Sequence, residues 1–241
     1  MKITYLAHSG FCIQIDKLAL IFDYFEGEIP ALETDTTIYV FSSHRHYDHF
    51  SFDIFKLALN YPNIHFILSF DIGKKYNRNY IMRKAHISEE TYSKISYMNA
   101  NVHMEFKDLA VDTLKSTDLG VAFIVHVSDF TIYHAGDLNW WTWNGETDEE
   151  YKNMTSRFKE EIEKIRNQHF NVAFLPIDPR QEDRFYLGFD YYMQNVSVDT
   201  VFPMHFWNDY TLADKLKSMD CSKNYKDKIV TICKNGQQFS I

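Results

Sequence analysis

Hydrophobic and polar residues alternate in short blocks near the N-terminus, and this pattern predicts β-strands over residues 2–6, 11–15 and 18–23. The third of these runs is apolar throughout and ends in the carboxylate of Asp23. A further apolar run over residues 38–43 predicts a strand that leads directly into a polar, histidine-rich loop. The first part of the chain is therefore expected to open a β-sheet that presents functional groups at a strand end.

Helical spacing first appears at Phe52, Phe55 and Leu59, which predicts a helix over residues 51–60 with Ser51 as its N-cap. A strand is expected over residues 64–68. Residues 71–99 are polar and poorly periodic, and they indicate only loops and short helices. Residues 101–134 contain several short strand candidates, the clearest being 121–127 and 130–134, which Ser128 and Asp129 join in a tight turn.

The rest of the chain alternates between helical and strand patterns. Helices are predicted over residues 148–168, 188–195 and 211–218, and strands over 171–175, 199–202 and 228–232. A β-rich block followed by such alternation predicts an α/β (α+β) fold with two central sheets flanked by helices. No Gly, Ser or Pro linker divides the chain, so we expect a single domain over residues 1–241.

Composition and charge narrow the function classes. The 241 residues are 45% hydrophobic and 17% aromatic, which excludes disordered and collagen-like chains. The 25 basic and 33 acidic residues give a net charge of −8, which argues against a general electrostatic grip on nucleic acid or an anionic membrane. The three cysteines lack zinc-ribbon or disulfide spacing, and no apolar run of about 18 residues indicates a membrane anchor. We expect a cytoplasmic protein with a small-molecule substrate, and the sequence predicts no oligomeric state.

Four metal-competent side chains stand within six residues, in His44-Arg45-His46-Tyr47-Asp48-His49, directly after a predicted strand. Alternate residues of an extended segment share a face, so His44 and His46 can converge on one ion. The turn into the following helix aims Asp48 and His49 at another point. A solvated polar loop is the alternative, and the density of ligands disfavours it.

With this string the sequence resembles the metallo-β-lactamase superfamily of metal-dependent hydrolases. Asp23 matches the family's strand-ending carboxylate, Asp137 in Thr131-Ile132-Tyr133-His134-Ala135-Gly136-Asp137 matches its bridging carboxylate, and His205 matches its last histidine. The resemblance implies a four-layer αβ/βα sandwich with the site at one edge of the paired sheets. The opening Tyr5-Leu6-Ala7-His8-Ser9-Gly10-Phe11 is most similar to the branch of L-ascorbate-6-phosphate lactonase-like proteins.

The resemblance implies two ion sites, one of which is incomplete. Asp48, His49, Asp137 and His205 would form a full set of four ligands, whereas His44, His46 and Asp137 would form a set of three. Ser116 stands where the family has a further histidine, and a neutral hydroxyl is a poor zinc ligand.

Three histidines are candidates to replace the missing ligand, namely His8, His103 and His134, and we favour His8. His134 precedes Asp137 by three residues on a strand and should point to the other side of the pleat. A packed, hydrogen-bonded role is therefore the simpler interpretation of His134.

The implied cofactor is one or two divalent transition-metal ions, zinc first, with manganese, iron or nickel as alternatives. Such an ion would activate a water and polarise a carbonyl or phosphoryl oxygen. Asp23 would then fix the tautomer of a ligand histidine from outside the coordination shell. Asp48 and Asp137 are the candidate catalytic carboxylates, and Asp48 could either bind metal or receive a proton.

Four further residues are candidates for a substrate pocket, and each has a structural alternative. Trp140 and Trp141 follow Asp137 closely and could form an apolar wall, or they could belong to the core. Arg180 could grip an anionic group, although a salt bridge to Asp178 explains it equally well. Trp207 stands two residues after His205, where it could touch substrate.

These observations favour a metal-dependent hydrolase acting on a small ester, lactone or phosphoester. The alternative from another class is a non-catalytic or metal-sensing protein with one degenerate site, which Ser116 motivates. A nuclease is a third hypothesis, which the acidic charge disfavours.

Overall fold

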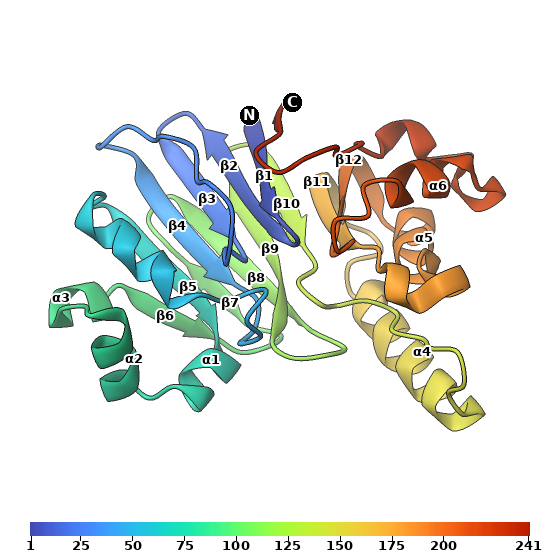
Figure 1. The fold of residues 1–241 in the computed structure, drawn as a ribbon, viewed down its shortest axis with the longest axis horizontal. Coiled ribbons are helices and arrows are strands. Elements are labelled where there is room, and N and C mark those ends of the chain that lie inside the picture. The colour runs from blue at the N-terminus through green and yellow to red at the C-terminus, as the bar shows by residue number, and fades with distance from the viewer. The chain divides into compact units, whose positions relative to one another are not determined.

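The structure, a computed structural model, describes residues 1–241 and divides into two compact units. The first unit comprises residues 1–99 together with 234–241, and the second comprises residues 100–233. Each unit is built around one β-sheet of mixed strand direction (Figure 1).

The first unit contains a seven-stranded sheet in the order β13-β1-β2-β3-β4-β5-β6. Antiparallel pairing joins β13 through β3, and parallel pairing joins β3 through β6. Because β13 pairs with β1, both termini lie at the same edge of this sheet (Figure 1). The strands are β1 (Lys2–Ala7), β2 (Gly10–Ile15), β3 (Leu18–Phe22), β4 (Thr37–Ser42), β5 (Ile64–Ser69), β6 (Ile95–Met98) and β13 (Gln238–Ser240).

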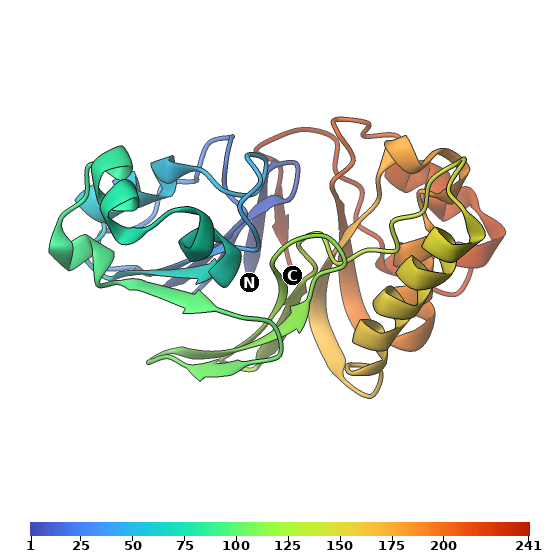
Figure 2. The same ribbon diagram turned by 90° about the horizontal axis from the view of Figure 1, so that it is seen from below.

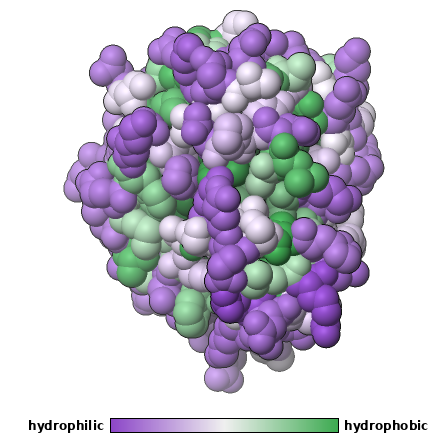
Figure 3. Space-filling model, turned by 90° about the vertical axis from the view of Figure 1, so that its left-hand side faces the viewer, coloured by the Kyte–Doolittle hydropathy of each residue, from purple (hydrophilic) through white to green (hydrophobic).

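Short helices cover one face of the first sheet (Figure 2). They are η1 (Phe52–Leu59), α1 (Phe70–Lys75), α2 (Arg78–Ala85) and α3 (Glu89–Tyr92). Ile54, Phe55 and Ile72 are buried with the strand residues in one hydrophobic cluster, which is how these helices are held to the sheet. The outer surface over these helices is mostly hydrophilic, with smaller hydrophobic areas between (Figure 3).

The second unit contains a six-stranded sheet in the order β12-β11-β10-β9-β8-β7. Here the pairs β12-β11 and β11-β10 are parallel, and the remaining pairs are antiparallel. The strands are β7 (His103–Glu105), β8 (Leu109–Lys115), β9 (Val121–Val127), β10 (Phe130–His134), β11 (His169–Pro176) and β12 (Ser197–Met204).

The helices of the second unit gather beside β10, β11 and β12, as Figure 2 shows for α4 and α5. A capping box between Thr147 and Glu150 begins α4, and Phe158 and Ile162 form its buried stripe. The helical elements are α4 (Asp148–Glu163), η2 (Pro179–Arg184), α5 (Leu187–Asn195), α6 (Leu212–Ser218), η3 (Asp220–Ser222) and η4 (Lys226–Lys228).

The predicted α/β class with two mixed sheets flanked by helices is confirmed. Three element predictions were wrong or incomplete. Residues 228–232 form no strand, because only Ile229 bridges to Val201 and the ladder does not extend. The predicted helix over 148–168 ends at Glu163, and the unassigned region contains the strand β6. The single-domain prediction stays a prediction. No helix has both the length and the apolar character needed to cross a bilayer.

Candidate functional site

The histidine-rich loop leaves the end of β4 in the first unit. The backbone N–H groups of His49 and Phe50 both donate to the carbonyl of His46, at 3.1 and 2.9 Å, and so close a tight turn. Phe50 is buried in the hydrophobic cluster beneath the helices and anchors the loop from its far side. The ligand string is thus held by a hydrogen-bonded turn and an apolar anchor rather than lying free in solvent.

Asp23 organises this loop from the end of β3. Its backbone has a positive φ of 43°, and its N–H donates to the carbonyl of Phe41 at 2.9 Å. The fully buried carboxylate accepts from the backbone N–H and the hydroxyl of Ser43, at 2.7 and 2.6 Å. It also lies 2.8 Å from Nδ1 of His49. A carboxylate at Nδ1 keeps the proton there and leaves Nε2 of His49 as the atom that can bind a metal.

The structure brings His44 and His46 together, as the alternation of the string predicts. Nε2 of His44 lies 3.0 Å from Nδ1 of His46, and Nδ1 of His44 lies 3.0 Å from the hydroxyl of Ser43. His44 is buried and His46 is exposed. The pair therefore reaches from the interior of the first unit to its surface.

His8 groups with Asp48 and His49 instead of with His44 and His46. The turn between β1 and β2 carries His8 at a positive φ of 52°, and its Nε2 lies 3.5 Å from a carboxylate oxygen of Asp48. The His8 and His49 rings are 5.5 Å apart and nearly perpendicular. Each of the three residues offers a ligand atom within 4.8 Å of the others. His8 therefore joins Asp48 and His49, whose expected ligand set is already complete. It does not join His44 and His46, the set that lacks a ligand and that we expected His8 to complete.

In the second unit, Asp137 follows β10 after a turn in which Gly136 has a φ of 51°. Its backbone carbonyl accepts hydrogen bonds from Nε1 of Trp141 at 2.9 Å and from the hydroxyl of Thr117 at 3.3 Å. Its buried carboxylate lies 3.4 Å from Nε2 of His205. Asp137 and His205 are thus brought together, as the sequence predicts.

His205 follows β12 and is held by a second carboxylate. Its Nδ1 lies 3.0 Å from the fully buried Asp178, which Arg180 contacts through its backbone N–H, Nε and Nη2. Burial alone would lower the pKa of His205, but Asp137 and Asp178 raise it to about 10. Burial would likewise raise the pKa of Asp178, whereas His205 and Arg180 lower it to about 2. Asp178 is therefore ionised and fixes the orientation of the His205 ring.

Each unit consequently contains the same arrangement. A buried carboxylate lies at Nδ1 of a buried histidine, as Asp23–His49 in the first unit and Asp178–His205 in the second. Sequence reasoning found Asp23 through the family resemblance but treated Asp178 only as a partner for Arg180. The signal for Asp178 was its place directly after a buried strand, at the strand end where β12 also delivers His205.

Ser116 is buried, and its hydroxyl accepts the backbone N–H of Asp118 at 3.1 Å. The other two candidate replacements lie elsewhere in the second unit. His103 is exposed on β7 between Glu105 and Asp112. His134 is fully buried and its Nδ1 accepts the N–H of Gly136 at 3.2 Å, which agrees with a packed, hydrogen-bonded role.

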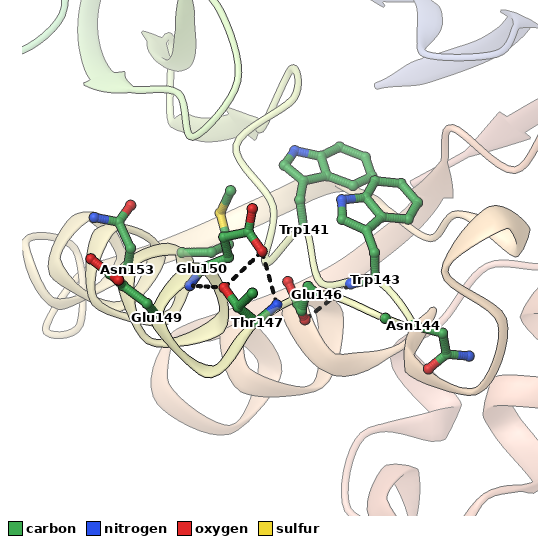
Figure 4. A pocket seen from close by; sticks show the side chains of 10 residues that line it. Trp141, Trp143, Asn144, Glu146, Thr147, Glu149, Glu150 and Asn153 are labelled. Atoms are coloured by element: carbon green, nitrogen blue, oxygen red, sulfur yellow. Dashed lines mark hydrogen bonds between the residues drawn. The ribbon is translucent and has the colours of Figure 1, made fainter.

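A hollow of about 760 Å³ opens in the second unit beside the Asp137 segment. Trp141 and Trp143 form one wall, with parallel rings 6.1 Å apart, and the start of α4 forms another (Figure 4). The Trp141 ring lies 5.4 Å from the His205 ring, so this wall leads directly to a candidate ligand. Trp140 does not line the hollow, since it packs against Phe158 and Tyr191.

Arg180 and Trp207 form a pair at the edge of the same group. The Arg180 guanidinium lies 4.8 Å from the centre of the Trp207 ring, which is 5.8 Å from the His205 ring. The salt bridge between Arg180 and Asp178, which the sequence left as an alternative, is present. Arg180 therefore acts first on the orientation of His205, and its side chain is still half exposed.

Comparison with known proteins gives a family match over more than half of the chain. Residues 2–150 match the family described as the beta-lactamase superfamily domain. A protein of Desulforamulus reducens named UPF0173 metal-dependent hydrolase is 25% identical over an alignment of 148 positions that covers 57% of this chain. The match spans 62% of that relative's length.

Solved structures share the fold at low sequence identity. A metallo hydrolase from the hyperthermophilic archaeon Ignicoccus hospitalis has a TM-score of 0.65 at 16% identity, covering 100% of this chain and 98% of its own. The metallo-beta-lactamase fold protein YhfI from Bacillus subtilis has a TM-score of 0.61 at 14% identity, covering 99% of each chain. These likenesses support the fold.

Proposed function

We propose that this chain, which belongs to the beta-lactamase superfamily domain family, is a metal-dependent hydrolase that acts on a small lactone or carboxylic ester. The observation that carries the proposal is the repeated pairing of a buried carboxylate with Nδ1 of a buried histidine, Asp23 with His49 and Asp178 with His205. Histidines that bind metals in proteins commonly have this kind of partner, which fixes the ring and raises its basicity.

The side chains present fit a divalent transition metal. The first unit offers the imidazoles of His8, His44, His46 and His49 with the carboxylate of Asp48, and the second offers Asp137 and His205. Nitrogen and carboxylate donors of this kind suit zinc, and manganese, iron and nickel remain alternatives. The family pattern in the sequence assigns a ligand role to the histidine loop in the first unit and to Asp137 and His205 in the second.

A bound divalent ion would supply hydroxide at neutral pH and polarise the oxygen of the scissile bond. The protein's own groups then have defined tasks. Asp23 and Asp178 hold protons at Nδ1 of His49 and His205 and so keep both rings oriented. Asp48, whose carboxylate lies 3.5 Å from Nε2 of His8, would add an oxygen donor beside that imidazole.

The hollow beside Trp141 supports a neutral substrate. Its lining contains Glu146, Glu149 and Glu150 and no lysine or arginine. Arg184, outside the lining, pairs with Glu146 at 2.6 Å, so Glu149 and Glu150 supply the negative charge. Hydrogen bonds from the backbone and hydroxyl of Thr147 lower the pKa of Glu150, which is therefore ionised at neutral pH. Carboxylates repel a phosphate group, whereas the Trp141 and Trp143 rings favour an apolar one. The opening motif Tyr5–Phe11 is similar to a branch named for a phosphorylated lactone, and of that substrate only the lactone part suits this lining.

Metal content and hydrolysis test the proposal together. Protein purified without added metal and then loaded should bind one or two transition-metal ions per chain by mass spectrometry. It should hydrolyse simple lactones, and a chelator should abolish that activity. Asp137→Asn should lower metal content and reduce kcat/KM at least about 100-fold, as loss of a ligand and a catalytic carboxylate would. A metal-free, inactive protein after loading with zinc, manganese, iron and nickel in turn would overturn the proposal.

The substrate class is tested separately at the hollow. Trp143→Ala should raise KM for an apolar lactone with little change in kcat, because it removes contact area that ground state and transition state share. Glu149→Lys should leave a neutral lactone unaffected and improve a phosphorylated analogue. Faster hydrolysis of the phosphorylated analogue by the unmodified protein would contradict the assignment.

A further inference from the structure

The loop between β8 and β9 is the part of the chain where the incomplete ligand set lacks its histidine. Ser116 occupies the position where the family pattern has a histidine, and its hydroxyl is used within the loop. The N–H of Ser116 donates to the carbonyl of Gly120 at 3.3 Å, and its hydroxyl accepts the N–H of Asp118 at 3.1 Å. Ser116 thereby shapes a tight turn that has Asp118 at its tip.

Thr117 ties this turn to the segment that carries Asp137. Its hydroxyl lies 2.6 Å from the carbonyl of Asn139 and 3.3 Å from the carbonyl of Asp137, and it accepts the N–H of Asn139 at 3.1 Å. The carbonyl of Thr117 in turn accepts from Nη2 of Arg157 at 2.7 Å. Thr117 is buried, so these bonds fix the position of the turn.

The turn therefore places the carboxylate of Asp118 beside that of Asp137, the predicted bridging ligand. Carboxylate oxygens of Asp118 and Asp137 lie within 4.8 Å of one another. Metal–oxygen bonds of about 2.0–2.2 Å place two ligand oxygens up to about 4.4 Å apart across an ion, so a small side-chain rotation suffices. Asp118 is exposed at the tip of the turn.

We propose that Asp118 is a metal ligand that takes the place of the histidine missing at Ser116. This inference rests on the proposed metal-dependent function and concerns an ion that Asp137 would bind. Replacing an imidazole by a carboxylate makes the donor set harder and more negative. The Asp118 site should therefore bind manganese better, relative to zinc, than a version of the same site with histidine.

The test measures metal binding directly, without reference to activity. Metal-free protein is titrated with zinc and with manganese by calorimetry, and bound metal is counted after dialysis. Asp118→Asn, which keeps the shape of the side chain, should weaken one ion at least about 10-fold. Asp118→His should raise the affinity for zinc relative to manganese at least about 10-fold. Asp129→Ala is the matched control, because Asp129 is an exposed aspartate in another tight turn of the same sheet.

The outcomes separate this inference from the function on which it rests. If the unmodified protein binds metal and Asp118→Asn binds the same number of ions with unchanged affinity, the inference is wrong and the hydrolase proposal stands. If the unmodified protein binds no metal, both fall. A thermal melt of each variant verifies folding, and Asp118→Glu, which retains the carboxylate, should bind as many ions as the unmodified protein.

Discussion

Residues around the candidate site are of two kinds, side chains that could bind a metal and side chains that orient those ligands. Asp178 and Asp23 are both fully buried, and each lies at Nδ1 of a histidine whose Nε2 points elsewhere. We expect Asp178→Asn to weaken metal binding about 10- to 100-fold, because the amide keeps the shape but loses the charge that orients and polarises His205. Calorimetric titration with zinc measures the change.

The second unit provides a matched control for that substitution. Asp199 also pairs with a histidine, His169, at 3.0 Å, but both side chains are about half exposed on the sheet surface. Asp199→Asn should leave metal affinity unchanged, since surface pairs contribute little and this one is unrelated to the candidate ligands. Equal losses in the two variants would show that Asp178 acts on general stability and not on His205.

Another residue-scale prediction concerns Cys12, which lies in the middle of the first sheet between β1 and β3. Burial raises the pKa of its thiol from 9.0 to about 12. The folded state thus retains a proton that the unfolded state loses above pH 9, so stability falls as pH rises from about 9 to 12, by about 1.4 kcal/mol per pH unit from this group. Denaturant unfolding at pH 8, 9, 10 and 11 should show that slope reduced in Cys12→Ala and retained in Cys233→Ala, whose thiol is exposed.

The candidate metal ligands that stand in a motif were predictable from the sequence. His44, His46, Asp48 and His49 are adjacent along the chain, and a strand end aligned them. Asp118 and Asp178 were not predictable as site residues, because each is a single aspartate whose position depends on bonds formed only in the fold. For Asp118 those bonds come from Thr117 and Ser116, and for Asp178 from Arg180 and His205.

At the scale of elements, α5 is packed against the segment that follows Asp137 without room for a side chain at Gly188. A Cβ atom there would lie 1.9 Å from the amide oxygen of Asn139 and 2.9 Å from the backbone nitrogen of Trp140. Asn139 is buried and bonded to Gln181, so it has no easy alternative position. Gly188→Ala should cost about 1–3 kcal/mol.

Chemical denaturation measures the loss of stability in Gly188→Ala, and metal titration measures a second expected effect. The shifted Asn139 should also disturb Thr117 and thereby weaken metal binding. Gln194→Ala, on the exposed side of the same helix, is the control and should change the free energy of unfolding by less than about 0.5 kcal/mol. A stable Gly188→Ala variant would show that α5 can move away from this segment.

Strands with strict alternation or continuous apolar runs, such as β3, β4 and β9, were predicted nearly to the residue because periodicity determines them. Strands that depend on pairing with a neighbouring strand were not predicted. β6 and β13 are short, and each pairs with one neighbour only, β6 with β5 and β13 with β1. Residues 229–232 show the converse, since Ile229 and Ile232 are buried there but only Ile229 bridges to β12 and the ladder does not extend.

At the scale of the whole molecule, the chain path argues for cooperative folding. The first unit is discontinuous, because its edge strand β13 comes from residues 234–241, after the entire second unit. A unit completed by the last residues of the chain is not finished until the segment between has been made. We therefore expect the two units to unfold in one transition, in keeping with the predicted single domain.

The positions of the tryptophans and of Cys12 allow the unfolding of each unit to be measured separately. All four tryptophans, at positions 140, 141, 143 and 207, belong to the second unit, whereas Cys12 belongs to the first. In a Cys221→Ser, Cys233→Ser variant, thiol labelling of Cys12 reports the first unit and tryptophan fluorescence reports the second. Coincident midpoints in guanidinium chloride would confirm cooperative unfolding. Separate midpoints would mean two independently stable units, because each probe would then follow its own sheet.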